Sequence, residues 1–221
     1  MATSTGTPAG SELPRLHLGC GEQYLEGYVN IDYPPSEHTV QTTSPADELA
    51  DITKLEYAPD SVAEVRLHHV FEHFDRPTAL RLLIDWHEWL ADGGVLTIET
   101  PDFERAVRAF SRRIGRGNRG TILRHVFGSH EADWAVHWDG WYEERYRRTL
   151  GALGYGSFKF ERAKWRGTHN ITVEARREGG PRDRERQYEA ADALLRDSLV
   201  DESESELRLL AEWSQRLRAR A

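Results

Sequence analysis

The stretch Leu16-His17-Leu18-Gly19-Cys20-Gly21, together with Tyr28-Val29-Asn30-Ile31-Asp32, decides the fold of this chain. An apolar strand runs into a Gly-x-Gly turn, and a second apolar strand ends on an acid. Glycine lets the backbone approach a ligand where a Cβ atom would clash. An aspartate that closes the neighbouring strand is placed to accept hydrogen bonds from a ribose diol. The two stretches therefore predict a nucleoside-binding site.

A dinucleotide site is the first alternative, and the sequence disfavours it. Such a site reads Gly-x-Gly-x-x-Gly, with the acid about 20 residues further on, after a full helix. Here the third glycine position is Tyr24, and the residues between Gly21 and Asp32 are too few for both a regular helix and a strand. The helix N-terminus that would bind a pyrophosphate is thus weakly supported.

The same residues resemble class I S-adenosylmethionine (SAM)-dependent methyltransferases, whose first motif often reads Leu-x-Leu-Gly-Cys-Gly. They are most similar to a small-molecule and glycan methyltransferase subgroup with a Gly-Tyr-Val-Asn-Ile-Asp second strand, here residues 27–32. The resemblance implies SAM as cofactor. It places the loop Gly19, Cys20 and Gly21 beside the methionine part of SAM. It also implies that Asp32 accepts hydrogen bonds from the ribose hydroxyls of SAM.

Strand and helix patterns alternate along the chain, which is typical of an α/β doubly wound, Rossmann-like fold. The resemblance adds seven mostly parallel strands and a terminal antiparallel hairpin. Strands are expected at 15–18, 28–32, 48–52, 61–69, 95–100, 155–164 and 170–177, and helices at 75–91 and 143–153. Asp92-Gly93-Gly94 is expected to stop the first helix, and Gly154 to follow the second as a C-terminal cap.

Composition shifts divide the chain into three parts. Residues 1–12 are small and polar and are expected to be disordered, residues 13–178 form the methyltransferase domain, and 104–142 within it form an acceptor-binding insertion. After a break at Gly179-Gly180-Pro181, residues 181–221 form a helical extension, with Ser203 and Glu206 as a capping box. Trp213 in that extension suggests packing on its own domain, a homodimer contact or an active-site lid.

Charge and cysteine content limit the partners. A net charge of −8 disfavours nucleic acid as a partner, and no apolar run reaches the roughly 20 residues of a membrane span. Cys20 is the single cysteine, and the N-terminus lacks a secretory leader, so a reducing cytoplasm is expected. The arginine-rich run 112–119 is either a solvated loop or a gate for an anionic or polyhydroxy acceptor.

Two further motifs resemble cofactor-binding segments of the methyltransferases. Asp51-Ile52 matches the acid-apolar pair that accepts from the adenine amine and packs on its ring. The run 69–73, His-x-x-Glu-His, matches the motif after the fourth strand, which implies that His69 and Val70 line the cofactor while Glu72 and His73 start a helix or face the acceptor. Taken alone, that run also matches an inverted zinc-protease motif, but such a motif needs both histidines on one helical turn.

Methyl transfer needs an acceptor oxygen in line with the methyl group and a base for its proton. The resemblance places these groups at the end of the fifth strand and before the helix at 143–153. His137 is the first candidate base, and Asp102 and His130 are the alternatives. Aromatic rings beside carboxylates suit a sugar acceptor, whereas an aromatic loop pinning the sheet edge is the alternative. The residues expected to bind the acceptor are Glu72, His73, Trp134, Trp138, Asp139, Trp141 and Tyr142.

The sequence therefore predicts a SAM-dependent O-methyltransferase that acts on a hydroxyl of a sugar or glycosylated small molecule, in polysaccharide or secondary-metabolite biosynthesis. A non-catalytic SAM-binding or scaffolding protein and an NAD-dependent oxidoreductase are the alternatives. No set of metal ligands is recognised in the sequence, although clustered acids leave assistance by Mg²⁺ open.

Overall fold

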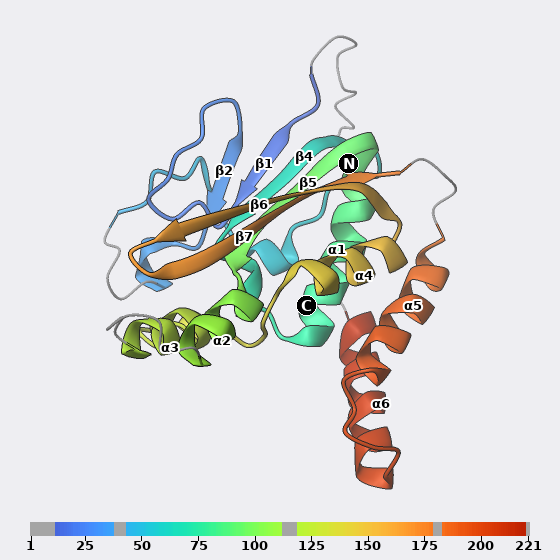
Figure 1. Ribbon diagram of the computed structural model, residues 1–221. Coiled ribbons are helices and arrows are strands. Elements are labelled where there is room, and N and C mark those ends of the chain that lie inside the picture. Colours follow the sequence, from blue (N-terminus) through green and yellow to red (C-terminus); the bar gives the residue numbers. More distant parts are fainter. Residues whose placement is uncertain (1–11, 38–42, 112–118, 179–182, 220–221) are drawn as a thin grey trace.

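A computed structural model describes residues 12–37, 43–111, 119–178 and 183–219. Within them a seven-stranded sheet has the order β3-β2-β1-β4-β5-β7-β6 (Figure 1). The first five strands in this order run parallel, and β7 is antiparallel to both β5 and β6. The predicted mostly parallel sheet with a terminal hairpin is confirmed. The strands are β1 Arg15–Leu18, β2 Val29–Asp32, β3 Glu48–Leu49, β4 Val62–His68, β5 Leu90–Pro101, β6 Tyr155–Trp165 and β7 Thr168–Arg177.

All the α-helices of the described residues come after β4 in the sequence. They are α1 Arg76–Trp89, α2 Phe103–Ser111, α3 Arg119–Phe127, α4 Glu143–Ala152, α5 Arg184–Arg196 and α6 Glu204–Arg218. Short 3₁₀ helices cover Pro35–Glu37, Ile52–Lys54, Phe71–His73 and Asp133–Ala135. The arginine-rich run and the break at 179–181 lie outside the described residues, apart from Arg119, which begins α3.

One hydrophobic core lies between the sheet and the helices. Apolar residues of β4 and β5, such as Val65 and Ile98, are fully buried in the same cluster as Leu83 and Trp86 of α1. Tyr146 of α4 joins them. In Figure 1, α1 and α4 lie on the same side of the strands. These buried side chains hold the carboxyl ends of the strands in fixed positions.

Side chains alternate along a strand, so the neighbours of the buried residues in β4 and β5 point to the other face of the sheet. Those neighbours include the polar residues Glu64, Arg66 and Glu99. Glu64 accepts hydrogen bonds from Arg15 and from Arg66 at 3.0 Å each. Thr172 donates to Glu99 at 3.1 Å. The connection from β1 to β2, all of it described, contains no helix. The helices of the described residues therefore do not cover the two faces of the sheet equally.

β1 is the strand at which the direction of the connections reverses. Leu16 lies opposite Val29 of β2 on one side and opposite Val65 of β4 on the other. In open α/β sheets, ligands bind beyond the carboxyl ends of the strands at such a switch point. The ends of β1, β2 and β4 are thus the place to look for a site.

Two differences from the sequence prediction concern helices. α1 is capped by Asp75 as expected of a helix start, but it ends at Trp89, before Asp92, because Leu90 already has extended backbone and pairs with Val62 of β4. α2 and α3 were not predicted. In α2 the apolar residues Phe103, Ala106, Val107 and Phe110 do follow helical spacing, although Ala106 is the buried one, whereas α3 buries no residue.

The C-terminal extension forms two helices, as expected, and packs against the domain. Leu195, Leu210 and Leu217 belong to the common core. Ser203 accepts from the Glu206 backbone N–H, but the Glu206 side chain accepts from Val200 N, so the capping box is not reciprocal.

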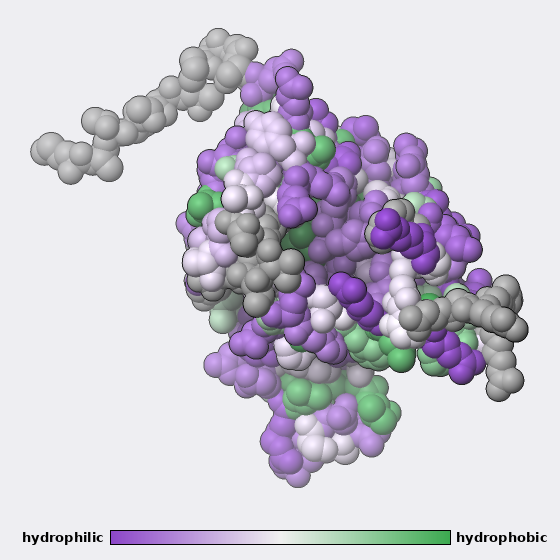
Figure 2. Space-filling model, turned by 90° about the vertical axis from the view of Figure 1, so that its left-hand side faces the viewer, coloured by the Kyte–Doolittle hydropathy of each residue, from purple (hydrophilic) through white to green (hydrophobic). Residues whose placement is uncertain are grey.

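Apolar side chains remain on the surface of this extension. Val200 is 90% exposed and Leu207 is 42% exposed. Figure 2 shows hydrophobic residues gathered at the lower end of the molecule, where α6 lies. No helix among the described residues is long and apolar enough to cross a membrane.

Candidate functional site

A cavity of about 640 Å³ opens at the carboxyl ends of β1, β2 and β4. This volume lies within the range of small-molecule and cofactor sites. The lining residues come from the glycine turn, the end of β2, the segment after β3, the end of β4 and the loop before α4. They are Gly19, Cys20, Gly21, Glu22, Gln23, Asp32, Tyr33, Ala50, Ile52, Thr53, His68, His69, Val70, His73, Phe74, Glu131 and Trp134.

The glycine turn is held against both neighbouring strands. The backbone N–H groups of Gly19 and Cys20 donate to the Ile31 carbonyl at 2.8 and 3.1 Å. Gly19 has φ +67°, and a Cβ atom there would lie 2.4 Å from Val70 Cγ2. Both the left-handed backbone and the close approach therefore require glycine.

Asp32 is fixed to this turn by its side chain. Its Oδ2 accepts from Gly21 N at 2.8 Å, and its Oδ1 accepts from Tyr33 N at 2.8 Å. The residue is 5% exposed and lines the cavity. The structure thus brings together the two sequence elements that predicted a nucleoside site.

Cys20 lines the cavity as a neutral thiol. Its side chain is buried, and this burial, together with the negative charge of Asp32, raises the thiol pKa to about 11. A thiolate is the nucleophilic form of cysteine, so this residue packs in the loop instead of reacting.

The two residues of the acid-apolar pair after β3, Asp51 and Ile52, have different positions in the structure. Ile52 lines the cavity, but Asp51 does not. The Asp51 carboxylate accepts from the Thr53 backbone and hydroxyl at 2.9 and 2.6 Å and lies 3.2 Å from Lys54. Its observed role is to cap the 3₁₀ helix at Ile52–Lys54.

His69 and Val70, which the resemblance placed beside the cofactor, line the cavity together with the glycine turn. His69 Nδ1 lies 3.2 Å from Glu72 Oε1, and its Nε2 lies 3.2 Å from Glu99 Oε1. Burial alone would lower the His69 pKa, but these two carboxylates raise it to about 10. In turn, the hydrogen bond from His69 lowers the pKa of Glu99 to about 2. His69 is therefore an imidazolium at neutral pH.

The zinc-protease interpretation of residues 69–73 is wrong for this fold. His69 has φ +55° and follows a strand, and Phe71–His73 form a single 3₁₀ turn. The two histidines consequently do not share one turn of an α-helix, which that motif requires.

A second group of side chains surrounds Glu72. Glu72 is 1% exposed, and its Oε1 lies 3.9 Å from His137 Nε2. The rings of His73 and His137 are 4.7 Å apart, and His73 lines the cavity whereas His137 lies behind it. Burial lowers the pKa of His137 to about 4, so its imidazole is neutral at pH 7.

Trp134 is the one residue between 133 and 142 that lines the cavity. Its ring meets the His73 ring edge to face, with 6.0 Å between the centroids. A flat apolar face beside an imidazole is therefore part of the cavity lining.

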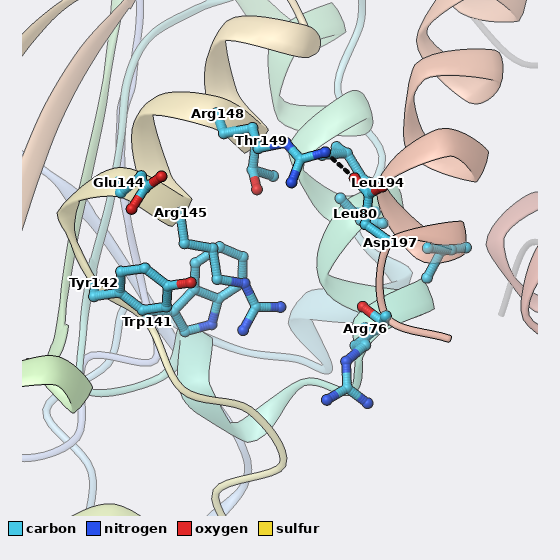
Figure 3. A pocket seen from close by; sticks show the side chains of 12 residues that line it. Arg76, Leu80, Trp141, Tyr142, Glu144, Arg145, Arg148, Thr149, Leu194 and Asp197 are labelled. Atoms are coloured by element: carbon cyan, nitrogen blue, oxygen red, sulfur yellow. Dashed lines mark hydrogen bonds and ion pairs between the residues drawn. The ribbon is translucent and has the colours of Figure 1, made fainter. Parts of the chain in front are cut away.

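Trp141, which was expected to bind the acceptor, lies in the core and does not line the main cavity. Its side chain is 2% exposed and stacks on Tyr146 at 4.9 Å between the ring centroids. The sequence shows an aromatic residue among polar ones, but not that its ring turns towards the core. Together with Tyr142, Trp141 borders a separate cavity of about 270 Å³. In Figure 3 the Arg145 guanidinium lies beside the Trp141 ring, 4.2 Å from its centroid.

Four further predicted site residues do not line the main cavity. Asp139 is paired with Arg145 at 2.6 Å. Trp138 is 60% exposed. Asp102 is buried and accepts from Arg105 N at the start of α2, and the His130 ring donates to the Phe127 carbonyl at 2.8 Å. The three candidate bases are thus not brought together.

Several residues of the cavity were not predicted. Tyr33, His68 and Phe74 are sequence neighbours of predicted site residues, and this proximity was the available signal. Glu131 lies in the loop before Trp134, where no regular pattern marks which side chains turn inward.

No protein-family model and no curated protein sequence matches this chain. Among solved structures, a SAM-dependent methyltransferase from Archaeoglobus fulgidus matches with a TM-score of 0.52 at 14% identity, over 74% of this chain and 86% of that one. SAM-dependent methyltransferases from Methanosarcina mazei match with a TM-score of 0.50 at 11% identity, over 76% of this chain and 94% of that one. The fold is therefore that of class I SAM-dependent methyltransferases.

A possible exported protein from Bordetella parapertussis also matches, with a TM-score of 0.48 at 17% identity. The match covers 76% of this chain, and the chain spans 63% of that protein's length.

Proposed function

We propose that this protein is a SAM-dependent O-methyltransferase that acts on a hydroxyl of a sugar or glycosylated small molecule. The observation that carries the proposal is the joined pair of Gly21 and Asp32 in the lining of a cavity that His73 and Trp134 also line. The first pair suits the adenosine of SAM, and the second pair suits a polar ring with an apolar face.

Methyl transfer requires that the site positions the acceptor oxygen and removes the proton of its hydroxyl group. The acceptor oxygen displaces the sulfur at the methyl carbon, in line and at about 3 Å before reaction. Of the candidate bases, His137 is the one whose ring contacts a cavity-lining side chain, namely His73. His137 is therefore the candidate base, and its imidazole is in the neutral form that accepts a proton.

Trp134 supports a sugar as the acceptor class. Indole rings stack on the C–H face of a sugar, while neighbouring polar groups bind its hydroxyls. Trp134 and Glu131 both line the cavity and supply one group of each kind.

The first test is calorimetry of the full chain with S-adenosylhomocysteine (SAH) and, separately, with NADH. We expect saturable binding of SAH and none of NADH, and the reverse result would indicate an oxidoreductase. The second test is transfer of labelled methyl from SAM to a panel of mono- and oligosaccharides. Binding of SAH without turnover on any hydroxylated acceptor would favour a non-catalytic SAM-binding protein.

A further inference from the structure

A buried carboxylate and two imidazoles converge beside the cavity. One potential ligand atom from each of Glu72, His73 and His137 lies within 4.8 Å of the others. In a tetrahedral site with bonds of about 2.1 Å, the ligand atoms are about 3.4 Å apart, so the most widely separated pair needs to approach by up to about 1.4 Å.

The carboxylate of this group is incompletely satisfied. Glu72 is 1% exposed, and no residue that the structure describes forms a hydrogen bond with its Oε2. His137 Nδ1 likewise lacks a partner among those residues. Its Nε2 lies 3.9 Å from Glu72 Oε1, which is too long for a hydrogen bond. Buried polar atoms are nearly always paired with protein, water or an ion, so these two atoms are open to a bound ligand.

The backbone holds the group in place without such a ligand. The Trp138 N–H donates to the Glu72 carbonyl at 2.9 Å, and the His137 N–H donates to the Phe127 carbonyl at 3.1 Å. These bonds fix the loop that carries His137 against the 3₁₀ turn that carries Glu72.

The orientation of His73 also fits a metal ligand. Its Nδ1 lies 3.2 Å from the Val136 carbonyl oxygen, to which it donates. A ligating histidine usually donates its second ring N–H to a carbonyl or carboxylate in this way, which leaves the other nitrogen as the ligand. His73 Nε2 is therefore the nitrogen expected to bind.

We propose that Glu72, His73 and His137 bind one first-row divalent transition-metal ion. Two imidazole nitrogens and one carboxylate oxygen suit Zn²⁺, Fe²⁺, Mn²⁺ or Co²⁺, whereas Mg²⁺ and Ca²⁺ prefer oxygen ligands. Three protein ligands leave positions for other molecules, and His73 places the ion beside the cavity. The proposal does not depend on methyl transfer, and because a nitrogen bound to the ion does not accept a proton, the base role proposed for His137 applies to the metal-free chain.

The test is a titration of the full chain, freed of metal with a chelator and desalted, without cofactor or acceptor. Co²⁺ is followed by its visible absorption, and Zn²⁺ by calorimetry. We expect one ion per chain, competition between Co²⁺ and Zn²⁺, and no displacement of Co²⁺ by Mg²⁺ at equal concentration. Failure to bind Co²⁺ and Zn²⁺ would overturn the proposal, and so would displacement by Mg²⁺.

Substitutions test which residues bind the ion. Glu72→Gln and His137→Gln should each weaken Co²⁺ binding by more than about 100-fold, beyond what loss of an outer partner of a ligand gives. His169→Gln is the matched control, because His169 is a half-buried histidine outside the group, and it should bind Co²⁺ as the unmodified chain does. Equal affinity in all three variants, or equal loss in all three, would refute the assignment.

Folding is checked separately by thermal unfolding of each variant in chelator. SAH calorimetry on the metal-free chain then distinguishes the two proposals. SAH binding without metal binding would refute the metal site alone, whereas metal binding without SAH binding would refute the proposed function alone.

Discussion

The Asp32 carboxylate accepts a hydrogen bond from the Gly21 backbone N–H at 2.8 Å. This bond joins the turn after β1 to the last residue of β2, so the two halves of the candidate cofactor site move as one unit. A second bond, from Tyr33 N, fixes the other carboxylate oxygen. The acid is therefore oriented before any ligand arrives, which reduces the ordering that binding requires.

Replacing Asp32 by alanine should weaken binding of SAH by about 1–3 kcal/mol, the usual cost of leaving buried hydroxyl groups unpaired. Calorimetry with SAH measures the effect. The exposed Asp92 provides the control, because Asp92→Ala removes a carboxylate that does not line the cavity. Unchanged affinity in Asp32→Ala would remove the ground for placing the ribose there.

Gly19→Ala should destabilise the fold more than Gly27→Ala does. Both glycines have positive φ, +67° and +81°, so both variants strain the backbone by about 1–2 kcal/mol. Only at Gly19 does the new Cβ also meet Val70, at 2.4 Å, whereas nothing lies within 4 Å at Gly27. Denaturant unfolding gives the two free energies.

The double variant Gly19→Ala/Val70→Ala checks the steric part of this argument. It should recover part of the loss, because the clashing Val70 methyl groups are gone. Equal losses in the two single variants would show that the close approach to Val70 does not matter.

The strand pattern was largely predictable because period-two alternation and glycine turns are local signals. β1 was predicted at its observed bounds, and the other six strands were found with end shifts. The helix α2 was missed although Phe103, Ala106, Val107 and Phe110 follow helical spacing, so its signal was present in the sequence. The helix α3 buries no residue and has a weaker apolar pattern.

The candidate site was predictable where a strand end fixes the position of a residue. Gly19, Asp32, His69 and Val70 all follow or end strands, and all line the cavity. The acceptor segment was harder, because no strand dictates which side chains of a loop turn inward. Trp134 turns into the cavity and Trp141 into the core, and the difference depends on tertiary packing.

His137→Ala should lower kcat by roughly 100-fold or more, the usual contribution of a positioned base, and leave SAH affinity unchanged. His130→Ala should have little effect on either quantity, because His130 does not line the cavity and its ring is bonded to the Phe127 carbonyl. Methyl-transfer kinetics and SAH calorimetry separate the two effects. Loss of SAH binding in His137→Ala with kcat retained would reassign His137 to positioning.

Trp134→Ala should raise the KM for a sugar acceptor, whereas Trp138→Ala should not. Trp134 lines the cavity and contacts His73, but Trp138 is 60% exposed and does not line the cavity. Loss of one stacking face is worth about 1 kcal/mol, which predicts a rise in KM of roughly fivefold. Equal changes in KM in the two variants would argue against stacking of the sugar on Trp134.

Asp75 links α1 to the C-terminal extension. Its side chain caps α1 by accepting from Thr78 N and also pairs with Arg216 of α6. Burial alone would raise the pKa of this carboxyl, but the bonds from Thr78 and Arg216 lower it below its usual value. A lowered folded-state pKa contributes stability above the unfolded pKa, and this stability is lost as the pH falls through the folded pKa.

Two variants separate the cap from the charge. Asp75→Ala removes both and should lower the free energy of unfolding at pH 7 by about 0.5–2 kcal/mol, while Asp75→Asn keeps a good cap and should lower it less. The difference between the unmodified chain and Asp75→Asn should be constant from pH 7 to about 5 and shrink below about pH 4, where the unfolded carboxyl is protonated. Denaturant unfolding across this range measures it. If that difference stays the same at the lowest pH, the charge on Asp75 does not hold α6 against α1.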